Sequence, residues 1–224
     1  MNKHITYLAV AAIAVSSVPF LSSCRIVKVK KNVETITRQL DLKDFNKIEV
    51  NGACDLEYTQ GPYSVTVTMP KEIGKNVITS VNDSLLKIED EHHGSFSARN
   101  RKITVIVSAP DLTLLRVNGA GDVDIKNINT PILYMESNGA GDIDIDDSKI
   151  ANNTVTINGA GKVDMDKIQG ETLTINVNGA GKVDVKGEYE HAFINLAGAS
   201  FADISELKCN DLHTTSSGAS KIEK

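Results

Sequence analysis

The octapeptide Asn118-Gly-Ala-Gly-Asp-Val-Asp-Ile125 recurs with small changes from Asn138, Asn158 and Asn178, so this half of the chain repeats every twenty residues. More degenerate copies begin at Asn51, Ala197 and Ser217. A fixed period of this length is typical of a solenoid, in which each repeat forms one coil and the coils stack to bury a common core. The sequence therefore predicts a repeat architecture.

Each repeat places two pairs of apolar residues on either side of its glycine-rich segment. In one repeat the pairs are Val155/Ile157 and Val163/Met165, and the spacing of two within each pair is the period of a β-strand. Asn and Gly between the pairs suit a tight corner, since both tolerate left-handed backbone and glycine permits close backbone approach. We expect an all-β fold, a right-handed single-stranded parallel β-helix (β-solenoid) with coils of about 20 residues.

The repeats align without gaps from Leu112, whereas the segment before them does not follow the twenty-residue spacing. The early copy at Asn51 fits the frame of the repeats, but the strands that follow it are separated by Pro70, Asn82-Asp83 and a polar loop. We expect an irregular, strand-rich N-terminal region, where a cap would protect the edge of the first coil. The predicted β-helix domain spans residues 41–224, with irregular coils or an insertion at 59–111 and regular repeats at 112–224.

The N-terminus has the features of an export signal. Lys3 is followed by an apolar run from Ile5 to Val15, which is shorter than the roughly 20 residues of a membrane-spanning helix, and then by Leu21-Ser-Ser-Cys24. Small residues directly before a cysteine resemble the bacterial lipobox. We predict a lipoprotein signal peptide at residues 1–23 and acylation of Cys24, which would anchor the chain to a membrane. An ordinary signal peptide is the alternative.

Residues 24–40 are interpreted as the acylated cysteine and a basic tether. Its cationic residues either contact anionic lipid head groups or remain solvated. They are Arg25, Lys28, Lys30 and Lys31. Without residues 1–23 the chain keeps 23 basic and 29 acidic residues, a formal charge of −6, which argues against nucleic acid as a partner. Cys54 and Cys209 fall in different coils, so we expect no disulfide between them.

A column of acids is expected on the outside of the second strands, one per coil. Its members are Glu57, Asp124, Asp144, Asp164, Asp184, Asp203 and Glu223. Stacked carboxylates about 4.8 Å apart repel one another and attract cations, of which Ca²⁺ is the candidate. The alternative is a solvated row that nearby lysines neutralise. The segment poorest in lysine is the candidate cation- or partner-binding site, namely Asp122, Asp124, Asp142, Asp144 and Asp146. No other cofactor is indicated.

Two further clusters carry residues suited to chemistry. Glu188-Tyr-Glu-His191 interrupts the repeat near Phe193, Phe201 and Asp203, and histidine beside carboxylates can transfer protons. The loop Glu89–Gly94 contains His92 and His93, a metal-binding combination if the loop is bent. The alternatives are a longer turn and a solvated loop. Neither cluster has a recognisable catalytic arrangement, so we assign no catalytic residues.

The segment Phe45-Asn-Lys-Ile-Glu-Val-Asn-Gly-Ala-Cys-Asp-Leu56, the segment Ala109-Pro-Asp-Leu112 and the tandem corners resemble the putative auto-transporter adhesin head GIN domain family, which is widespread in Bacteroidetes. The resemblance covers roughly residues 40–224. It implies a right-handed parallel β-helix in exported proteins, often lipoproteins, whose molecular function is not established and whose pattern contains no catalytic residues.

These features favour an envelope-anchored, non-enzymatic lipoprotein that acts as a binding or adhesion-type module for an envelope protein or glycan. The first alternative is a structural protein that self-associates through an open end of the stack. The second is a β-helix enzyme acting on polysaccharides. Location at the outer membrane is expected, but basic residues after Cys24 depart from the acidic residues usual in surface lipoproteins of that phylum, so surface-exposed and periplasm-facing positions both remain open.

Overall fold

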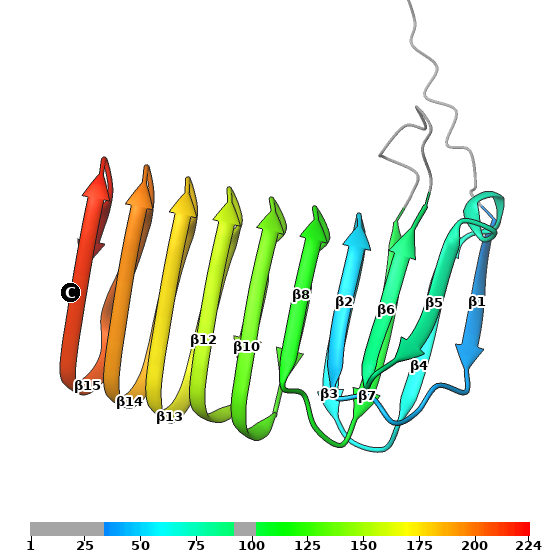
Figure 1. Cartoon of the computed structure of the whole chain (residues 1–224), viewed down its shortest axis with the longest axis horizontal. Helices are drawn as coiled ribbons and strands as arrows, with labels where there is room; N and C mark the ends of the chain where they lie inside the picture. Colours follow the sequence, from blue (N-terminus) through cyan, green and yellow to red (C-terminus); the bar gives the residue numbers. More distant parts are fainter. Residues whose placement is uncertain (1–33, 92–101) are drawn as a thin grey trace, which may run out of the picture. The chain divides into compact units, whose positions relative to one another are not determined.

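The computed structural model describes residues 34–91 and 102–224, which form sixteen strands and one short 3₁₀-helix (Figure 1). The predicted signal peptide and Cys24 lie outside these residues, as do His92 and His93. The elements before the regular repeats are β1 (Thr35–Leu40), β2 (Lys47–Gly52), β3 (Cys54–Gln60), β4 (Ser64–Pro70), η1 (Lys71–Ile73), β5 (Val77–Asn82), β6 (Leu85–Asp90) and β7 (Ile103–Ala109).

The repeats form the remaining strands, which lengthen toward the C-terminus because neighbouring segments of a coil merge into one strand. They are β8 (Leu114–Gly119), β9 (Val123–Lys126), β10 (Asn129–Gly139), β11 (Ile143–Asp146), β12 (Lys149–Gly159), β13 (Lys162–Gly179), β14 (Lys182–Gly198), β15 (Phe201–Gly218) and β16 (Lys221–Glu223).

Parallel pairing at a register of twenty residues confirms the predicted solenoid. Val155 of β12, for example, lies beside Met135 of β10 on one side and Ile175 of β13 on the other. Figure 1 shows the strands β8, β10, β12, β13, β14 and β15 standing side by side in sequence order. A β-strand cannot satisfy its own backbone groups, so each coil depends on its neighbours for hydrogen bonds.

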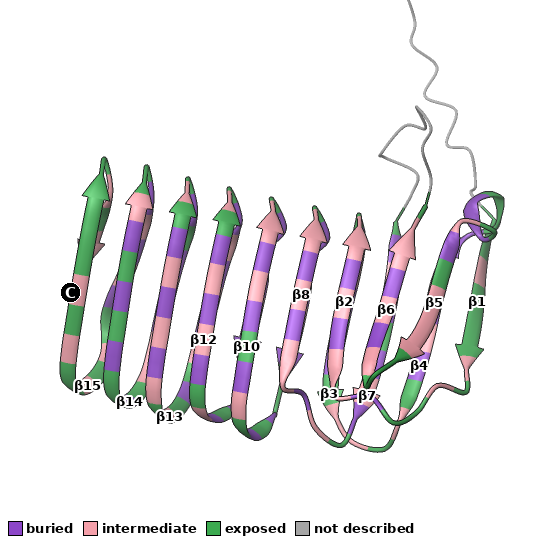
Figure 2. Cartoon of the chain, in the orientation of Figure 1, coloured by how far each residue is buried: buried purple, intermediate pink, exposed green. Residues whose placement is uncertain are grey.

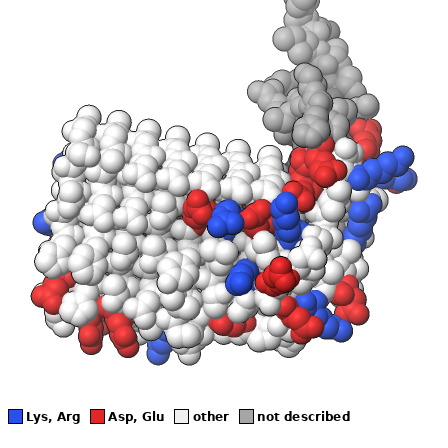
Figure 3. Space-filling model, viewed as in Figure 1, with Lys and Arg blue, Asp and Glu red and all other residues white. Residues whose placement is uncertain are grey.

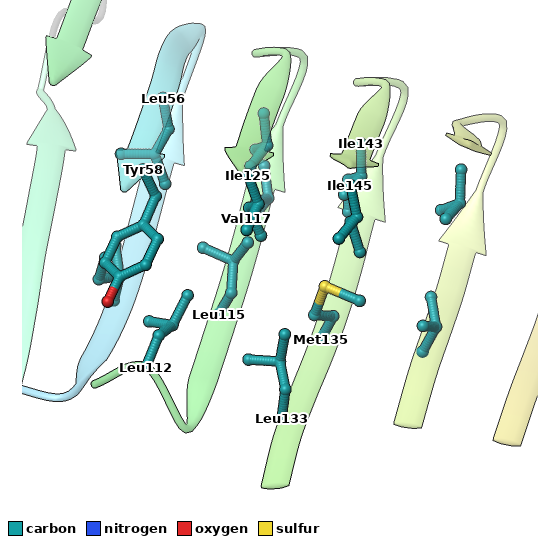
Figure 4. Close-up of a cluster of buried hydrophobic side chains, with 14 of the residues drawn as sticks. Leu56, Tyr58, Leu112, Leu115, Val117, Ile125, Leu133, Met135, Ile143 and Ile145 are labelled. Carbon is teal, nitrogen blue, oxygen red and sulfur yellow. The ribbon is translucent and has the colours of Figure 1, made fainter. Parts of the chain in front are cut away.

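The apolar pairs predicted to face inward form the core. Leu115, Val117, Ile143 and Ile145 are all at most 2% exposed, and Figure 4 shows these side chains stacked from coil to coil. Buried and less buried residues alternate along the strands in Figure 2, as the period of two requires. Burying one such side chain contributes about 1.5–3 kcal/mol, so the core accounts for most of the cohesion between coils.

Close backbone approach explains the glycines at the corner. A Cβ atom added to Gly139 would lie 1.7 Å from the carbonyl oxygen of Gly119, and one added to Gly141 would lie 2.0 Å from that of Gly121. Between these two glycines, the N–H of Ala140 donates to the Gly119 carbonyl at 3.0 Å. Successive corners therefore stack backbone on backbone, with no room for a side chain at either glycine.

The asparagines that begin each corner form a ladder of side-chain amides, which is a different role from the one predicted. The described non-glycine residues with positive φ do not include them. Instead, each Nδ2 donates to the Oδ1 of the preceding coil at 2.7–3.0 Å. The ladder runs through Asn51, Asn118, Asn138, Asn158 and Asn178. Stacked amides of this kind add a hydrogen bond between each pair of coils.

Left-handed backbone occurs at the second corner of the coil instead. Asn127, Asp147 and Lys167 have φ of 56°, 49° and 53°. In the next coil the register shifts between Met165 and Ile168, which brings Gly187 opposite Ile168. The coil that contains Gly187 is one residue shorter than the coil before it. Glycine is needed at this position because a Cβ atom added there would lie 2.1 Å from the Ile168 carbonyl oxygen.

The N-terminal region is more regular than predicted, because β6 and β7 make up most of a coil. β6 is parallel to β2, and β7 is parallel to β3. The coil made by β2 and β3 therefore lies between β6–β7 on one side and β8–β9 on the other, although β6 and β7 follow it in sequence. The described N-terminal region departs from the regular repeats in two ways. Its coils do not stack in the order of the sequence, and antiparallel strands cover them.

Antiparallel strands cap this end of the stack. β4 pairs with β7, β1 pairs with β4, and β5 pairs with β6. β1 comprises the last six residues of the predicted tether, so the strand-forming part of the chain begins earlier than the boundary at residue 41. Its partly buried Ile36 and Leu40 share one face and pack against the core, which explains why this segment is ordered against β4.

The opposite end of the described stack is formed by β15, which pairs with β14 along its length. On its other side, the described chain supplies only β16, opposite Phe201–Asp203. The core continues to this end with partly buried Leu207, Leu212 and Ile222. Cys54 is fully buried in β3 and Cys209 is partly buried in β15, so the two cysteines lie in different coils.

Candidate functional site

The predicted acid column is present and in register over seven coils. Asp144 lies beside Asp124 and Asp164, and the pairing continues from Glu57 at one end through Asp184 and Asp203 to Glu223 at the other. On the far side of Glu57 the column ends at Ile106 of β7. Alternation along the strands turns these side chains away from the core, and every acid between Asp124 and Asp203 is only partly exposed.

A hollow of about 450 Å³ lies over the middle of this column. We call it the acid hollow. It is lined mainly by charged side chains, which are Asp124, Lys126, Asp144, Asp146, Asp164, Asp166, Asp184 and Lys186. Six carboxylates thus face two ammonium groups, so the hollow attracts cationic groups.

The surroundings of the acids raise the pKa of Asp144 near the middle of the column and lower the pKa of Asp203 toward one end. Burial raises the pKa of Asp144, and the charges of Asp164 and Asp124 raise it further. Lys162 pairs with Asp164, and this contact raises the pKa of the lysine. At the other end, hydrogen bonds from the hydroxyl and the N–H of Ser205 lower the pKa of Asp203. Proton uptake is therefore favoured at Asp144 and disfavoured at Asp203.

The structure places the five predicted site residues in three neighbouring columns. Asp124 and Asp144 stand in the acid column, Asp146 stands in the column after it, and all three line the acid hollow. Asp122 and Asp142 lie two residues before Asp124 and Asp144, where their Oδ1 atoms accept hydrogen bonds from the backbone N–H of the next coil at 3.2 and 3.1 Å. Asp55 accepts the same bond from Asp122 at 3.1 Å. These acids hold adjacent corners together, which is a structural role.

The break in the repeat does not assemble the predicted cluster. The Nδ1 of His191 lies 2.9 Å from the carboxylate of Asp211, its register neighbour, whereas Asp203 bonds to Ser205 in the acid column. Glu188 pairs with Lys208 at 2.8 Å beside Tyr189, whose ring packs against Gly170. Glu188, Tyr189 and Lys208 line a separate hollow of about 480 Å³, on the side of the coils where the chain returns to its next first strand.

Among residues 34–91 and 102–224, no three His, Cys, Asp or Glu side chains are grouped so that they can hold a metal ion. The stacked acids face one another in a single row, whereas calcium is usually surrounded by six to eight oxygens. The same residues include no helix with the length and apolarity needed to cross a membrane. Binding of a cation in the acid hollow stays a prediction.

A second surface, which sequence reasoning overlooked, lies on the first strands of the later coils. The outward positions of β12 to β15 on this side are occupied by Thr, Asn, Ser and a few aromatic residues, without Lys, Arg, Asp or Glu over three adjacent columns. The signal was available in the sequence, because segments such as Thr154-Val-Thr156 and Thr172-Leu-Thr174-Ile-Asn176 alternate apolar residues with uncharged polar ones.

Comparison with known proteins identifies the family of this chain and solved structures with the same fold. The sequence profile described as "Putative auto-transporter adhesin, head GIN domain" matches residues 44–223. The chain belongs to this family. A search of curated proteins found none that matches it.

Solved structures similar to this family member share its fold at low sequence identity. A putative adhesin from Bacteroides fragilis is 20% identical, with a TM-score of 0.66 over 85% of this chain and 96% of the other. A putative lipid binding protein from Parabacteroides distasonis is 17% identical, with a TM-score of 0.59 over 86% and 97%. A putative adhesin from the same species is 18% identical, with a TM-score of 0.54 over 86% and 97%.

Proposed function

We propose that this protein is an envelope-anchored, non-enzymatic binding module of the adhesion type. The observation that carries the proposal is the regularity of its outward columns, which present the same kind of side chain on successive coils over long faces. Surfaces of this kind are what repeat proteins use to bind extended partners. Membership of the family and the names of the similar structures, putative adhesins among them, support the same class.

The anchor in this proposal is the acylated Cys24. The charged start at Lys3, the apolar run and the small residues before the cysteine occur in the order that a lipoprotein requires. The membrane is then one partner, and an envelope protein or glycan is the other. The basic residues after Cys24 leave both a surface-exposed and a periplasm-facing position at the outer membrane open.

The proposal is tested on cells that produce the full-length chain with a C-terminal tag. Intact cells are treated with a protease and, separately, with a membrane-impermeant crosslinker. Loss of the tag from intact cells would indicate surface exposure, and retention until the outer membrane is permeabilised would indicate a periplasmic position. A specific crosslinked protein or glycan, absent with an unrelated lipoprotein, is the expected result. Only background in both compartments would refute a binding function.

Self-association is the second candidate, because most of β15 has a strand partner on one side only in the described chain. Unpaired backbone groups along a strand edge can pair with a second molecule. A rise in mass with protein concentration in sedimentation measurements, reversed by a proline at a position of β15 whose backbone N–H points away from β14, would favour this function. A constant monomer mass would exclude it.

A further inference from the structure

Three columns of outward side chains on β12 to β15 form one uncharged surface, which we call the neutral face. They follow the register of the first strands, so that each column runs across four coils. The neutral face consists of Thr154, Thr156 and Asn158; Thr174, Asn176 and Asn178; Phe193, Asn195 and Ala197; and His213, Thr215 and Ser217.

The middle column of the three is charged in the earlier coils, so its neutral character is not a general property of this side. Arg116 of β8 lies between Glu49 of β2 and Glu136 of β10, with N–O distances of 2.9 and 3.0 Å. These three residues stand in the column that continues as Thr156 and Asn176. Figure 3 shows the charged row stopping and an uncharged surface continuing toward the C-terminal end.

A hollow of about 420 Å³ lies within the neutral face. Its polar lining includes Thr156, Asn176, Asn178, Asn195, Thr215 and Ser217. The Nδ2 of Asn195 donates to the Oδ1 of Asn176 at 3.0 Å, which fixes the orientation of both amides.

The asparagine ladder ends at this hollow. Asn178 donates to Asn158 at 3.0 Å, but its register neighbour in the next coil is Ala197, which has no side-chain donor. The last Oδ1 of the ladder is therefore presented to an outside donor. A ligand with several hydroxyl groups can bond both to this acceptor and to the Nδ2 of Asn176.

Aromatic rings stand in the column of side chains next to Asn176 and Asn195. Phe193 is 37% exposed and stacks on His213, with ring centroids 5.2 Å apart and an angle of 10° between the planes. Tyr134, in the same column, is 49% exposed. Thr154 and Thr174, which are smaller, stand between the two rings. One column therefore combines exposed aromatic surface with hydroxyl groups.

We propose that the neutral face binds a neutral oligosaccharide. A sugar ring has an apolar C–H face, which suits an exposed aromatic ring such as Phe193, and a rim of hydroxyls, which suits the amides of Asn176, Asn178 and Asn195. Coils about 4.8 Å apart nearly match the advance of an extended glycan per sugar unit, so successive sugars can lie over successive coils.

Other ligand classes fit the neutral face less well. A nucleic acid or an acidic glycan is bound through Lys and Arg, which this surface lacks. Protein interfaces are enriched in Arg and bury an apolar centre, whereas six of the eight residues that line the hollow carry an amide or a hydroxyl group. The inference rests on the proposed binding function and assigns its ligand class and its surface.

The test uses the purified full-length protein in detergent micelles and an array of neutral, acidic and basic glycans. Any glycan that binds is then titrated with the wild-type protein and three variants. Phe193→Ala removes the exposed ring. Asn195→Asp places a charge in the hollow and removes the donor to Asn176. Asn210→Asp adds the same charge at an exposed position of β15 outside the neutral face and is the matched control. Thermal unfolding verifies that every variant is folded.

Binding of a neutral glycan is expected, with affinity reduced about tenfold or more by Phe193→Ala and by Asn195→Asp and changed less than about twofold by Asn210→Asp. Binding confined to charged glycans, or neutral binding that neither variant weakens, would overturn the inference. So would a complete lack of glycan binding. If crosslinking on cells then still identified a protein partner, the binding function would hold and only the glycan assignment would be wrong. If crosslinking also gave only background, both the binding function and the glycan assignment would be refuted.

Discussion

At the scale of single residues, the glycines of the corner are set by the distance between coils. Each lies so close to the backbone of the preceding coil that a methyl group overlaps a carbonyl oxygen. The spacing of glycines in the sequence already indicated close approach, but the role of Asn was missed, because its partner is another Asn in the next coil and not its own backbone.

We predict that Gly139→Ala destabilises the protein by about 3 kcal/mol or more, since overpacking that the backbone must relieve lies at the upper end of its usual range. Unfolding in urea, followed by circular dichroism, measures the change. Gly61→Ala is the control, because its added Cβ would lie 2.9 Å from the hydroxyl of Ser108, a side chain that can rotate away. If the two variants lost the same free energy of unfolding, the contact between Gly139 and the backbone of the preceding coil would not be the reason for glycine at this position.

The acid column yields a prediction about pH. A raised carboxyl pKa means that the folded state holds the proton more tightly than the unfolded chain, so protonated Asp144 favours folding. That contribution is lost as the pH rises from the ordinary value of 3.8 through the higher pKa of the folded state. Asp144→Asn should therefore raise the thermal midpoint at pH 7 and have little effect well below pH 3.8.

Asp203→Asn is the matched control in the same column. Its pKa is lowered, so the ionised carboxylate favours the folded state above 3.8, and this contribution disappears as the pH falls. The variant should lower the midpoint at pH 7. Shifts of the same sign for Asp144→Asn and Asp203→Asn, in thermal melts across pH 3 to 8, would show that like-charge repulsion does not govern the column.

At the scale of elements, the Asn ladder joins five coils through side chains alone. Asn138 donates to Asn118 at 2.9 Å and to Glu136 at 3.0 Å, and it accepts from Asn158 at 2.9 Å. Asn138→Ala removes these bonds and should cost about 1–3 kcal/mol in the free energy of unfolding. Asn152→Ala, which loses one exposed bond of 3.5 Å, should change it by less than about 0.5 kcal/mol.

Chemical denaturation of both variants measures the difference between the two positions. If Asn138→Ala were as stable as Asn152→Ala, the ladder would contribute no net stability. The neighbours Asn118 and Asn158 were readable from the repeat, whereas the hydrogen bonds between the amides were not, since the repeat does not determine the direction in which each side chain turns.

At the scale of the whole molecule, the stack behaves as a row of nearly equal units, each bound to its two neighbours. Deletion of residues 138–157 joins Ser137 to Asn158 and removes one complete coil in register. We expect a folded protein of lower stability. Deletion of residues 138–147 removes half a coil, shifts every later strand out of phase and should abolish cooperative unfolding.

Circular dichroism and thermal unfolding compare the two deletions. Similar stability for the deletions of ten and twenty residues would contradict the register of the solenoid, because only the longer one preserves the alignment of the apolar pairs.

The proposed anchor also belongs to this scale. Cys24→Ser should abolish labelling by palmitate and move the protein from the membrane fraction to the soluble fraction of the envelope. Cys209→Ser, at a partly exposed thiol of the last long strand, should leave both unchanged. Membrane association that persists in the Cys24→Ser variant without labelling would refute the lipid anchor.

The sequence alone was sufficient for the period, the inward pairs and the register of the acid column, because a repeat of constant length places equal residues at equal positions. Only the tertiary structure revealed that β2–β3 lies between β6–β7 and β8–β9, which brings Asn51 beside Asn118. It also showed that Asp122 and Asp142 lie outside the acid hollow and bond to the backbone of the next coil. These outcomes depend on pairing between distant segments, and an interrupted repeat carries no local record of which coil will be its neighbour.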